Sequence, residues 1–254
     1  MTVVGVLHPG EMGAAVAGAL SRRGETVLWA SAGRSSATAE RARAAGLEDA
    51  GEIEELCSRC EILLSICPPH AALDVARAAS SFTGIYVDAN AIAPDTARTI
   101  AALQPRFVDG GIVGPPPDRP RTTRLYLSGD EAERVAGLLA GTNVDARVIS
   151  AEPGAASALK AAYAGWTKGS AALLLTVREL ARAEGVEDAL LEEWRLSIPE
   201  LEERLPGAER SARRKGWRWI GEMEEISRSM AAQDLPAGFH EAAAEVFRRT
   251  AEES

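Results

Sequence analysis

Residues 3–20 read VVGVLHPGEMGAAVAGAL, and the interpretation of the whole chain starts from this stretch. The apolar, β-branched run predicts a strand buried on both faces over residues 2–7. The glycines that follow predict a tight turn into a helix over residues 11–23 that is rich in small side chains. Such a unit offers backbone N–H groups and the positive end of a helix dipole to phosphates.

The turn itself resembles those that bind dinucleotides. Gly10 would let the backbone approach a pyrophosphate, and Gly13 would let the helix lie close to the strand. His8 takes the place of the first glycine of the usual G-x-G-x-x-G pattern. An ordinary strand-to-helix turn that binds nothing is the alternative. The residues expected to contact a cofactor here are His8, Pro9, Gly10, Glu11, Met12 and Gly13.

The residues after the second predicted strand, 26–30, indicate which dinucleotide is bound. An acidic side chain at this place would bind the ribose hydroxyls of NAD. The chain has Ser31, Arg34 and Ser35 instead, and no acid before Glu40. Hydroxyls and a guanidinium suit a 2′-phosphate, so the sequence favours NADP over NAD. The alternative is a solvated loop whose serine caps the next helix.

Strands alternate with helices up to residue 149, which predicts a doubly wound, mostly parallel sheet of the Rossmann type. From Gly154 the pattern becomes entirely helical, with separate helices expected over 199–205 and 209–230 around Pro206-Gly207. We therefore expect two domains. Residues 1–153 would form an NADP-binding α/β domain, and residues 154–254 an all-α domain for substrate binding and dimerisation.

Ligands of open α/β sheets bind beyond the carboxyl ends of the strands. Cys67, Pro68 and Asn90 follow two predicted strands there, and we expect them to contact the cofactor. The strand at 106–109 is expected to end in a stiff, glycine-rich loop over residues 110–117 with free backbone N–H groups. This loop could hold a substrate carboxylate or carbonyl. The alternative is a rigid loop at the edge of the domain. The residues of it expected to bind substrate are Gly110, Gly111 and Ile112.

Lys160 is unusual because the chain has 25 arginines and only three lysines. Where arginine is so strongly preferred, a lysine on an apolar helix indicates a group that must release a proton. Lys160, Tyr163 and Thr167 share one helix face. We expect Lys160 and Tyr163 to be catalytic, with either of them as the proton donor and Lys160 favoured, and Thr167 to contact substrate. Lys168 should be solvated. The alternative is a lysine that extends to water without a catalytic role.

Composition excludes several classes of partner. The net charge of −9 argues against nucleic acid and anionic membranes. No apolar run is long enough to span a membrane and no basic-then-apolar leader is present, so we expect a cytoplasmic protein. Cys57 and Cys60 form a C-x-x-C without a second ligand pair, so no metal is expected. Two alternatives would explain this pair. It could mark the end of a helix that runs into a strand, or it could be a redox dithiol.

Four motifs together resemble the β-hydroxyacid dehydrogenase superfamily, which includes 6-phosphogluconate and 3-hydroxyisobutyrate dehydrogenases. HPGEMG at 8–13 resembles the family's G-L-G-x-M-G, and DANAIAP at 88–94 resembles D-x-S-T-x-x-P. DGGIVGP at 109–115 resembles the substrate segment D-A-P-V-S-G-G, and GAASALK at 154–160 resembles G-x-G-x-x-x-K. The resemblance covers about the first 185 residues. The remainder resembles the smaller helical domain of 6-phosphogluconate dehydrogenase-like proteins.

The resemblance implies an NADP-dependent oxidoreductase with Lys160 as general acid/base and hydride transfer between nicotinamide and a small hydroxy or keto substrate at the domain interface. Departures from the family pattern fall on substrate contacts: Tyr163-Ala164, Val113 and Asn90-Ala91 replace family residues. Activity on 6-phosphogluconate or 3-hydroxyisobutyrate is therefore not expected. An imine reductase using Tyr163 and a non-catalytic NADP-binding protein are the alternatives. The resemblance also implies a homodimer formed through the helical domain.

Overall fold

The computed structural model describes residues 1–252, which divide into two compact units. The first unit is Met1–Lys160, and the second begins at Ala161. The division falls inside the long helix α7, Ala155–Ala183, whereas the sequence places a boundary in the loop before that helix.

The strands described in the first unit form one eight-stranded sheet in the order β3-β2-β1-β4-β5-β6-β7-β8. All neighbouring strands are parallel except the antiparallel pair β6–β7. The first six strands have the order of a doubly wound dinucleotide-binding sheet, which confirms the predicted fold class. The strands are β1 Val3–Val6, β2 Thr26–Trp29, β3 Glu48–Asp49, β4 Ile62–Ser65, β5 Ile85–Asp88, β6 Phe107–Val113, β7 Thr123–Ser128 and β8 Val144–Ser150.

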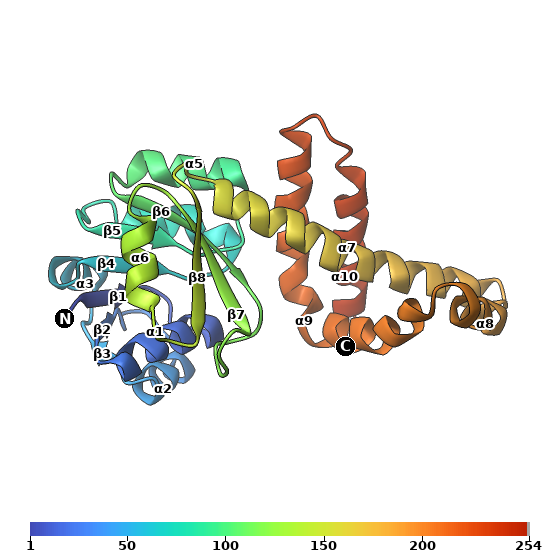
Figure 1. Ribbon diagram of the computed structural model, residues 1–254, viewed down its shortest axis with the longest axis horizontal. Coiled ribbons are helices and arrows are strands. Elements are labelled where there is room, and N and C mark those ends of the chain that lie inside the picture. Colours follow the sequence, from blue (N-terminus) through green and yellow to red (C-terminus); the bar gives the residue numbers. More distant parts are fainter. Residues whose placement is uncertain (253–254) are drawn as a thin grey trace. The chain divides into compact units, whose positions relative to one another are not determined.

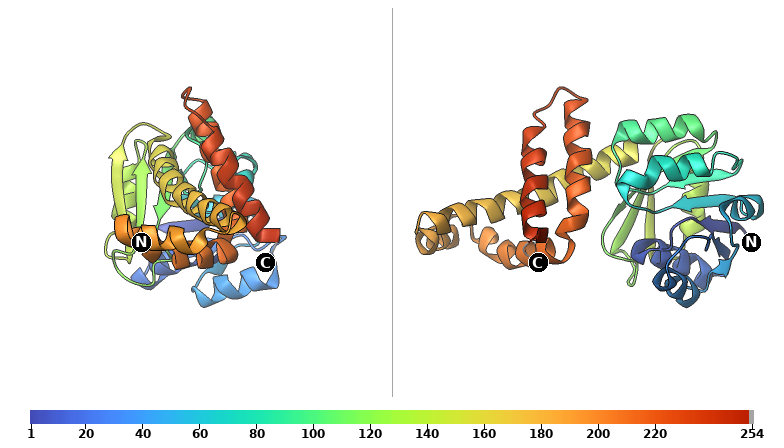
Figure 2. Two further views of the ribbon diagram at one scale, coloured as in Figure 1. Left: turned by 90° about the vertical axis from the view of Figure 1, so that its right-hand side faces the viewer. Right: turned by 180° about the vertical axis from the view of Figure 1, so that it is seen from behind.

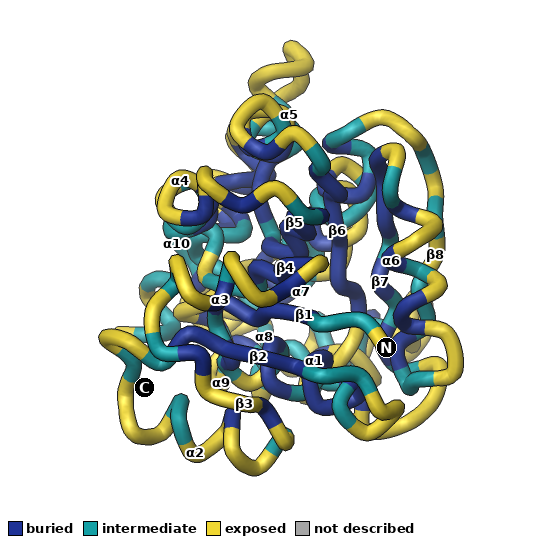
Figure 3. Tube along the Cα trace, turned by 90° about the vertical axis from the view of Figure 1, so that its left-hand side faces the viewer, coloured by how far each residue is buried: buried dark blue, intermediate teal, exposed yellow. Residues whose placement is uncertain are grey.

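Helices cover both faces of this sheet (Figure 1). Side chains alternate along each strand, so Ile62 and Leu64 pack into one core while Leu63 between them packs into the other. In Figure 3 the central strands are largely buried, and the outer turns of the helices are exposed. The helices are α1 Glu11–Arg23, α2 Ser36–Ala44, α3 Ile53–Arg59, α4 Ala72–Ala78 after a 3-10 turn at Pro69–Ala71, α5 Pro94–Leu103 and α6 Ala132–Leu139.

The regular secondary structure of the second unit is all helical over its described residues, as predicted. Besides the rest of α7 it contains α8 Glu187–Ser197, α9 Pro199–Ala231 and α10 Gly238–Glu252, and α9 and α10 pack side by side (Figure 2). The prediction of two helices around Pro206 was wrong, because α9 continues through this proline. Figure 1 shows that α9 bends, as expected where a proline removes a backbone hydrogen bond.

Close packing of α7 on α10 depends on two glycines. A side chain at Gly165 or Gly169 would lie 3.1 or 3.2 Å from Nε2 of His240. The His240 ring is buried, and its Nε2 lies 3.2 Å from the Gly165 carbonyl oxygen. His240 therefore has a structural role in this unit.

Lys168 is not solvated, contrary to the prediction. It forms an ion pair with Glu222, and both side chains are less than a fifth exposed. Its Nζ also lies 5.4 Å from the ring centroid of Trp219. The burial expected from the apolar residues of this helix therefore applies to Lys168, together with its partner Glu222 from α9.

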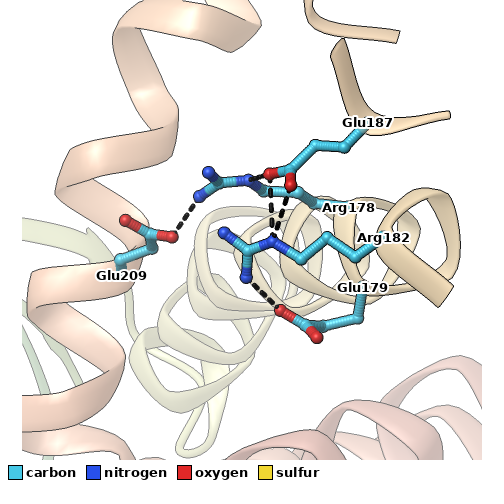
Figure 4. Close-up of polar contacts among 5 residues, drawn as sticks. All are labelled: Arg178, Glu179, Arg182, Glu187 and Glu209. Atoms are coloured by element: carbon cyan, nitrogen blue, oxygen red, sulfur yellow. Dashed lines mark hydrogen bonds and ion pairs between the residues drawn. The ribbon is translucent and has the colours of Figure 1, made fainter. Parts of the chain in front are cut away.

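A second group of charges ties α7 to the two following helices (Figure 4). Arg178 donates to Glu187 at 2.6 Å and also contacts Glu209. Arg182 donates to the same Glu187 carboxylate at 3.0 Å and to Glu179 at 2.6 Å. The Arg178 side chain is 17% exposed, so this network is less screened than a surface ion pair.

Candidate active site at the carboxyl edge of the sheet

The glycine turn after β1 has the close packing that the sequence predicts. A Cβ added at Gly13 would lie 2.3 Å from the carbonyl oxygen of His8, so only glycine fits there. An added Cβ at Gly10 meets nothing within 4 Å, which leaves open space in front of the turn. Gly10 is the N-cap of α1, and its side-chain-free backbone precedes the N–H groups of the first helical turn. A turn of this geometry can hold a phosphate.

His8 and Arg34 bring buried, unpaired polar atoms to this turn. Within the described residues, Nδ1 of His8 and Nε of Arg34 are both buried without a hydrogen-bond partner. Burial, followed by the nearby Arg34 charge, lowers the pKa of His8 to about 4, so the imidazole is neutral at pH 7. Because buried polar groups normally have partners, the two orphaned atoms fit an anionic ligand that would occupy this place.

The segment after β2 is built as a turn that carries Arg34. The Arg34 N–H donates to the Ser31 carbonyl at 3.0 Å, and Gly33 within the turn has a φ of 69°. The Ser35 hydroxyl caps α2 by accepting from the Thr38 N–H at 3.3 Å. Ser35 is therefore a helix cap, as the alternative interpretation of this loop expected, while Arg34 remains the candidate for a 2′-phosphate.

Asn90 lies in a buried network rather than extending toward a ligand. Its amide donates to Ser65 Oγ at 3.2 Å and to Asp88 Oδ2 at 2.9 Å, and its Oδ1 accepts from the Cys67 N–H. Asn90 is 3% exposed. The predicted cofactor contact at Asn90 therefore cannot come from a free side chain. Asn90 instead fixes the turn containing Cys67 and Pro68, which keeps the backbone of that turn available.

The prediction of a substrate loop beginning at Gly110 was wrong in its structure. β6 continues through Val113, and Gly110, Gly111 and Ile112 are buried in it and paired with β7. Glycines in the sequence suggested a loop, but an antiparallel partner strand and a helix packed on the strand explain them better. β5 ends at Asp88, opposite Asp109, so Gly110–Val113 extend past its carboxyl end.

Lys160 packs onto this extension of β6. A Cβ added at Gly111 would lie 2.7 Å from the Ala156 carbonyl oxygen and 3.1 Å from Lys160 Cβ. Lys160 is half-buried. In doubly wound sheets ligands bind beyond the carboxyl ends of the strands, and this is the edge at which Lys160 lies.

Tyr163 and Thr167 follow Lys160 on α7, and both are exposed. The Thr167 hydroxyl donates to the Tyr163 carbonyl at 3.0 Å, so its proton is used within the helix. The catalytic role of Tyr163 and the substrate contact of Thr167 stay predictions.

The C-x-x-C pair is a helix end running into a strand. Cys57 lies in α3, Cys60 follows its last residue, and the three cysteines of the chain are free. Burial raises the pKa of each thiol, which disfavours the reactive thiolate. Within residues 1–252 no group of three or more His, Cys, Asp or Glu side chains could hold a metal ion.

Sequence reasoning missed the buried polar residues beneath this edge. Ser65, Asp88, Asp109 and Ser128 are register partners across four neighbouring strands, and all are fully buried. Burial raises the pKa of Asp88 to about 7 and also raises the pKa of Asp109. The signal was an aspartate at or near the end of each of two apolar strands.

The site therefore has the features of a dinucleotide-binding α/β protein, and comparisons with known proteins place it in a family. A domain of unknown function, DUF1932, matches residues 181–250. An uncharacterized 28.5 kDa protein in the 7S RNA 5′ region of Methanothermus fervidus is 34% identical over 163 residues. That alignment covers 63% of this chain and 63% of the relative.

Solved structures match over nearly the whole chain. A conserved protein of unknown function, described as structurally similar to 3-hydroxyacid dehydrogenases, is 30% identical with a TM-score of 0.77, covering 98% of this chain and 97% of that one. A 3-hydroxyisobutyrate dehydrogenase of Mycobacterium tuberculosis, solved with L-serine, is 17% identical with a TM-score of 0.75, covering 100% and 94%. A reductive aminase of Aspergillus terreus, solved with NADPH and ethyl-5-oxohexanoate, is 19% identical with a TM-score of 0.63, covering 100% and 95%.

The last two likenesses concern the fold alone. The 30% identical structure, which is covered to 97% and is described as similar to 3-hydroxyacid dehydrogenases, shows that the chain belongs to the β-hydroxyacid dehydrogenase superfamily.

Proposed function

We propose that the chain is an NADP-dependent oxidoreductase that transfers hydride between nicotinamide and a small hydroxy or keto substrate. The observation that carries this proposal is the packing of Lys160 on Gly111, beyond the carboxyl end of β5. It puts the only lysine described in the first unit at the edge where a dinucleotide-binding sheet holds its ligand. The family supports the activity, and the orphaned atoms of His8 and Arg34 support a phosphorylated cofactor.

The residues that would hold NADP lie in three turns at this edge. The glycine turn from His8 to Gly13 would bind the pyrophosphate, and Arg34 would bind the 2′-phosphate, assisted by Ser31 and Ser35. The turn at Cys67 and Pro68 would line the cofactor with its backbone. When bound, the cofactor supplies the hydride.

Lys160 would hold and move the proton on the substrate oxygen. A half-buried amine on a helix can donate a proton to a developing alkoxide and take it back in the reverse direction. Gly110, Gly111 and Ile112 would contribute the wall beside it through β6, with Gly111 letting the Lys160 stem lie close to the strand. Thr167 would contact the substrate from the next turns of α7.

The test is a titration of the purified chain with NADPH and NADH, followed by turnover on a panel of small oxo acids, other carbonyls and imines. We expect NADPH to bind more tightly than NADH. Lys160→Ala should lower turnover by about 10²- to 10⁴-fold, the usual contribution of general acid–base catalysis, without weakening NADPH binding. Lys215→Ala, the same change on α9, is the matched control. Absence of affinity for both nucleotides would end the proposal.

The same panel separates the alternatives. Imine reduction with loss of turnover only in Tyr163→Phe would favour the C=N reductase, for which the exposed Tyr163 is the candidate donor. Tight NADPH binding with no oxidation by any carbonyl or imine would favour a binding protein.

We also propose a homodimer formed through the second unit. Trp166, Leu173 and Leu180 recur every seven residues on α7, and each is more than three-fifths exposed. Large apolar side chains repeated on one helix face favour burial against a second copy. Sedimentation should give a dimer that Leu173→Glu dissociates, whereas a monomeric wild-type protein would contradict this.

No helix within residues 1–252 is long and apolar enough to cross a membrane, and the cytoplasmic location stays a prediction.

A further inference from the structure

Asp109 is a buried carboxylate that holds the start of α7. It is 0% exposed and lies on β6. Its Oδ1 accepts from the Ser157 hydroxyl at 2.6 Å, and its Oδ2 accepts from the Ser157 N–H at 2.8 Å and the Ser128 hydroxyl at 3.2 Å. Ser128 Oγ in turn accepts from the Ala156 N–H at 3.1 Å. Two backbone N–H groups of the first turn of α7 are thus satisfied from the sheet.

These contacts match what the beginning of a helix needs. The first four N–H groups of a helix have no partner inside it, and a negative charge there is stabilised by the helix dipole. Burial raises the pKa of the Asp109 carboxyl, and the donors of Ser157 and Ser128 oppose that rise. A buried carboxylate without such donors would be costly, so the aspartate and the helix start are fixed together.

The same strand also sets where Lys160 lies. Gly111 is two residues after Asp109, so both face the same side of β6. Ser157 is three residues before Lys160, so both lie on the same side of α7. β6 therefore meets one face of the helix twice, by hydrogen bonds at Ser157 and by close packing of Gly111 against the Lys160 stem.

We propose that Asp109 is the positioning residue of Lys160: it anchors the first turn of α7 so that the Lys160 stem rests on Gly111. This inference rests on the proposed function for its catalytic consequence. It assigns no contact with substrate to Asp109. A shift of the helix start by about 1 Å would misplace the amine, and misplacements of that size can cost about 100-fold in rate.

Two variants weaken the anchor in different ways. Asp109→Asn keeps the shape but removes the negative charge that faces the first turn of α7, and its amide group would donate to Ser157 Oγ instead of accepting from it. Ser157→Ala removes only the hydroxyl and keeps the N–H contact, so it carries the test if Asp109→Asn does not fold. Thr142→Val is the matched control, because it removes a hydroxyl that donates to the Leu139 carbonyl and accepts from the Val144 N–H.

The position of Lys160 can be observed without activity because the chain has only three lysines. Reductive methylation with ¹³C-formaldehyde gives one NMR resonance per lysine, and Lys160→Arg assigns that of Lys160. We expect this resonance to shift in Asp109→Asn and Ser157→Ala, with faster amide exchange over residues 155–160. Thr142→Val should change neither.

In turnover assays we expect kcat to fall about 10- to 100-fold in both anchor variants, while KM for NADPH stays nearly constant. A purely structural role would lower the melting temperature, as we expect for Thr142→Val, and leave kcat unchanged. Wild-type kcat and an unshifted Lys160 resonance in both anchor variants would overturn the inference. If the wild-type protein neither binds nor oxidises NADPH, the proposed function fails, and the resonance and exchange data still decide whether Asp109 positions Lys160.

Discussion

Replacing Gly13 by alanine tests the geometry of the cofactor turn. The added Cβ would lie 2.3 Å from the His8 carbonyl oxygen and 3.3 Å from its carbonyl carbon. Ordinary contact begins at 3.4 Å, so α1 or the turn must move by about 1 Å. Both opposing atoms are backbone atoms and cannot rotate away. Overpacking of this kind costs about 1–3 kcal/mol, and we expect the upper half of that range.

The consequence for binding follows from the same displacement. If the turn moves, its N–H groups no longer converge on one phosphate. A loss of about 2–3 kcal/mol at this site raises the NADPH dissociation constant roughly 30- to 140-fold, since each 1.4 kcal/mol is tenfold. Urea denaturation and fluorescence titration of NADPH measure the two effects separately.

Two further glycine variants make the comparison specific. Gly10 has φ −68° and ψ −170°, and nothing lies within 4 Å of its added Cβ. Gly10→Ala should therefore leave stability within about 0.5 kcal/mol of wild type, yet weaken NADPH binding by filling the space of the pyrophosphate. Gly137→Ala, on the exposed side of α6, should raise stability by about 0.5–1 kcal/mol and leave binding unchanged. Wild-type stability of Gly13→Ala, or equal destabilisation by Gly10→Ala, would refute the reasoning.

Three more outcomes are expected. Arg34→Ala should lower the preference for NADPH over NADH about tenfold or more by removing a charge-assisted contact, whereas Arg43→Ala on exposed α2 should not; competitive titration of the two nucleotides decides this. Burial raises the pKa of Asp88 from 3.8 to about 7, so the folded state binds more protons than the unfolded chain in that window. The contribution of this carboxyl to the free energy of unfolding is complete below pH 3.8 and is lost as the pH rises to about 7, by at most about 1.4 kcal/mol per pH unit. In urea denaturation across this pH range, Asp88→Asn should lack this fall of stability with pH. An unchanged pH dependence in Asp88→Asn would contradict the assignment. Phe247→Ala should lower the free energy of unfolding by about 3–5 kcal/mol, because Phe247 is 0% exposed and packs edge-on against a tryptophan, while Trp217→Ala at an exposed site should cost under 1 kcal/mol by the same assay.

The sheet order was predictable because its signals are local. Apolar β-branched runs, small-residue helices and the glycine turn agree with one another, so β1, α1 and the alternation of strands and helices follow from the sequence. Lys160 was predictable as a candidate from its rarity among arginines. The structure packs it on Gly111 at the carboxyl edge of the sheet, and its role stays a prediction.

What could not be predicted depends on distant partners. Gly110 and Gly111 look like a loop until β7 pairs with them, and Pro206 looks like a helix end until the rest of α9 packs. Lys168 looks solvated because its partner Glu222 lies far along the chain. Asn90 looks like a ligand contact because its network is assembled by residues at the ends of β4 and β5. In each case tertiary contacts override the local preference.

The buried row from Ser65 to Ser128 has a consequence for engineering, because the residues that hold the turns are not those on their outward surfaces. Side chains inside the sheet hold the turns from below, through Asn90 on one side and Asp109 on the other. The outward surfaces of those turns therefore contribute little to the stability of the fold. A library that varies them should yield a large share of folded members, so this scaffold suits laboratory evolution toward new ligands.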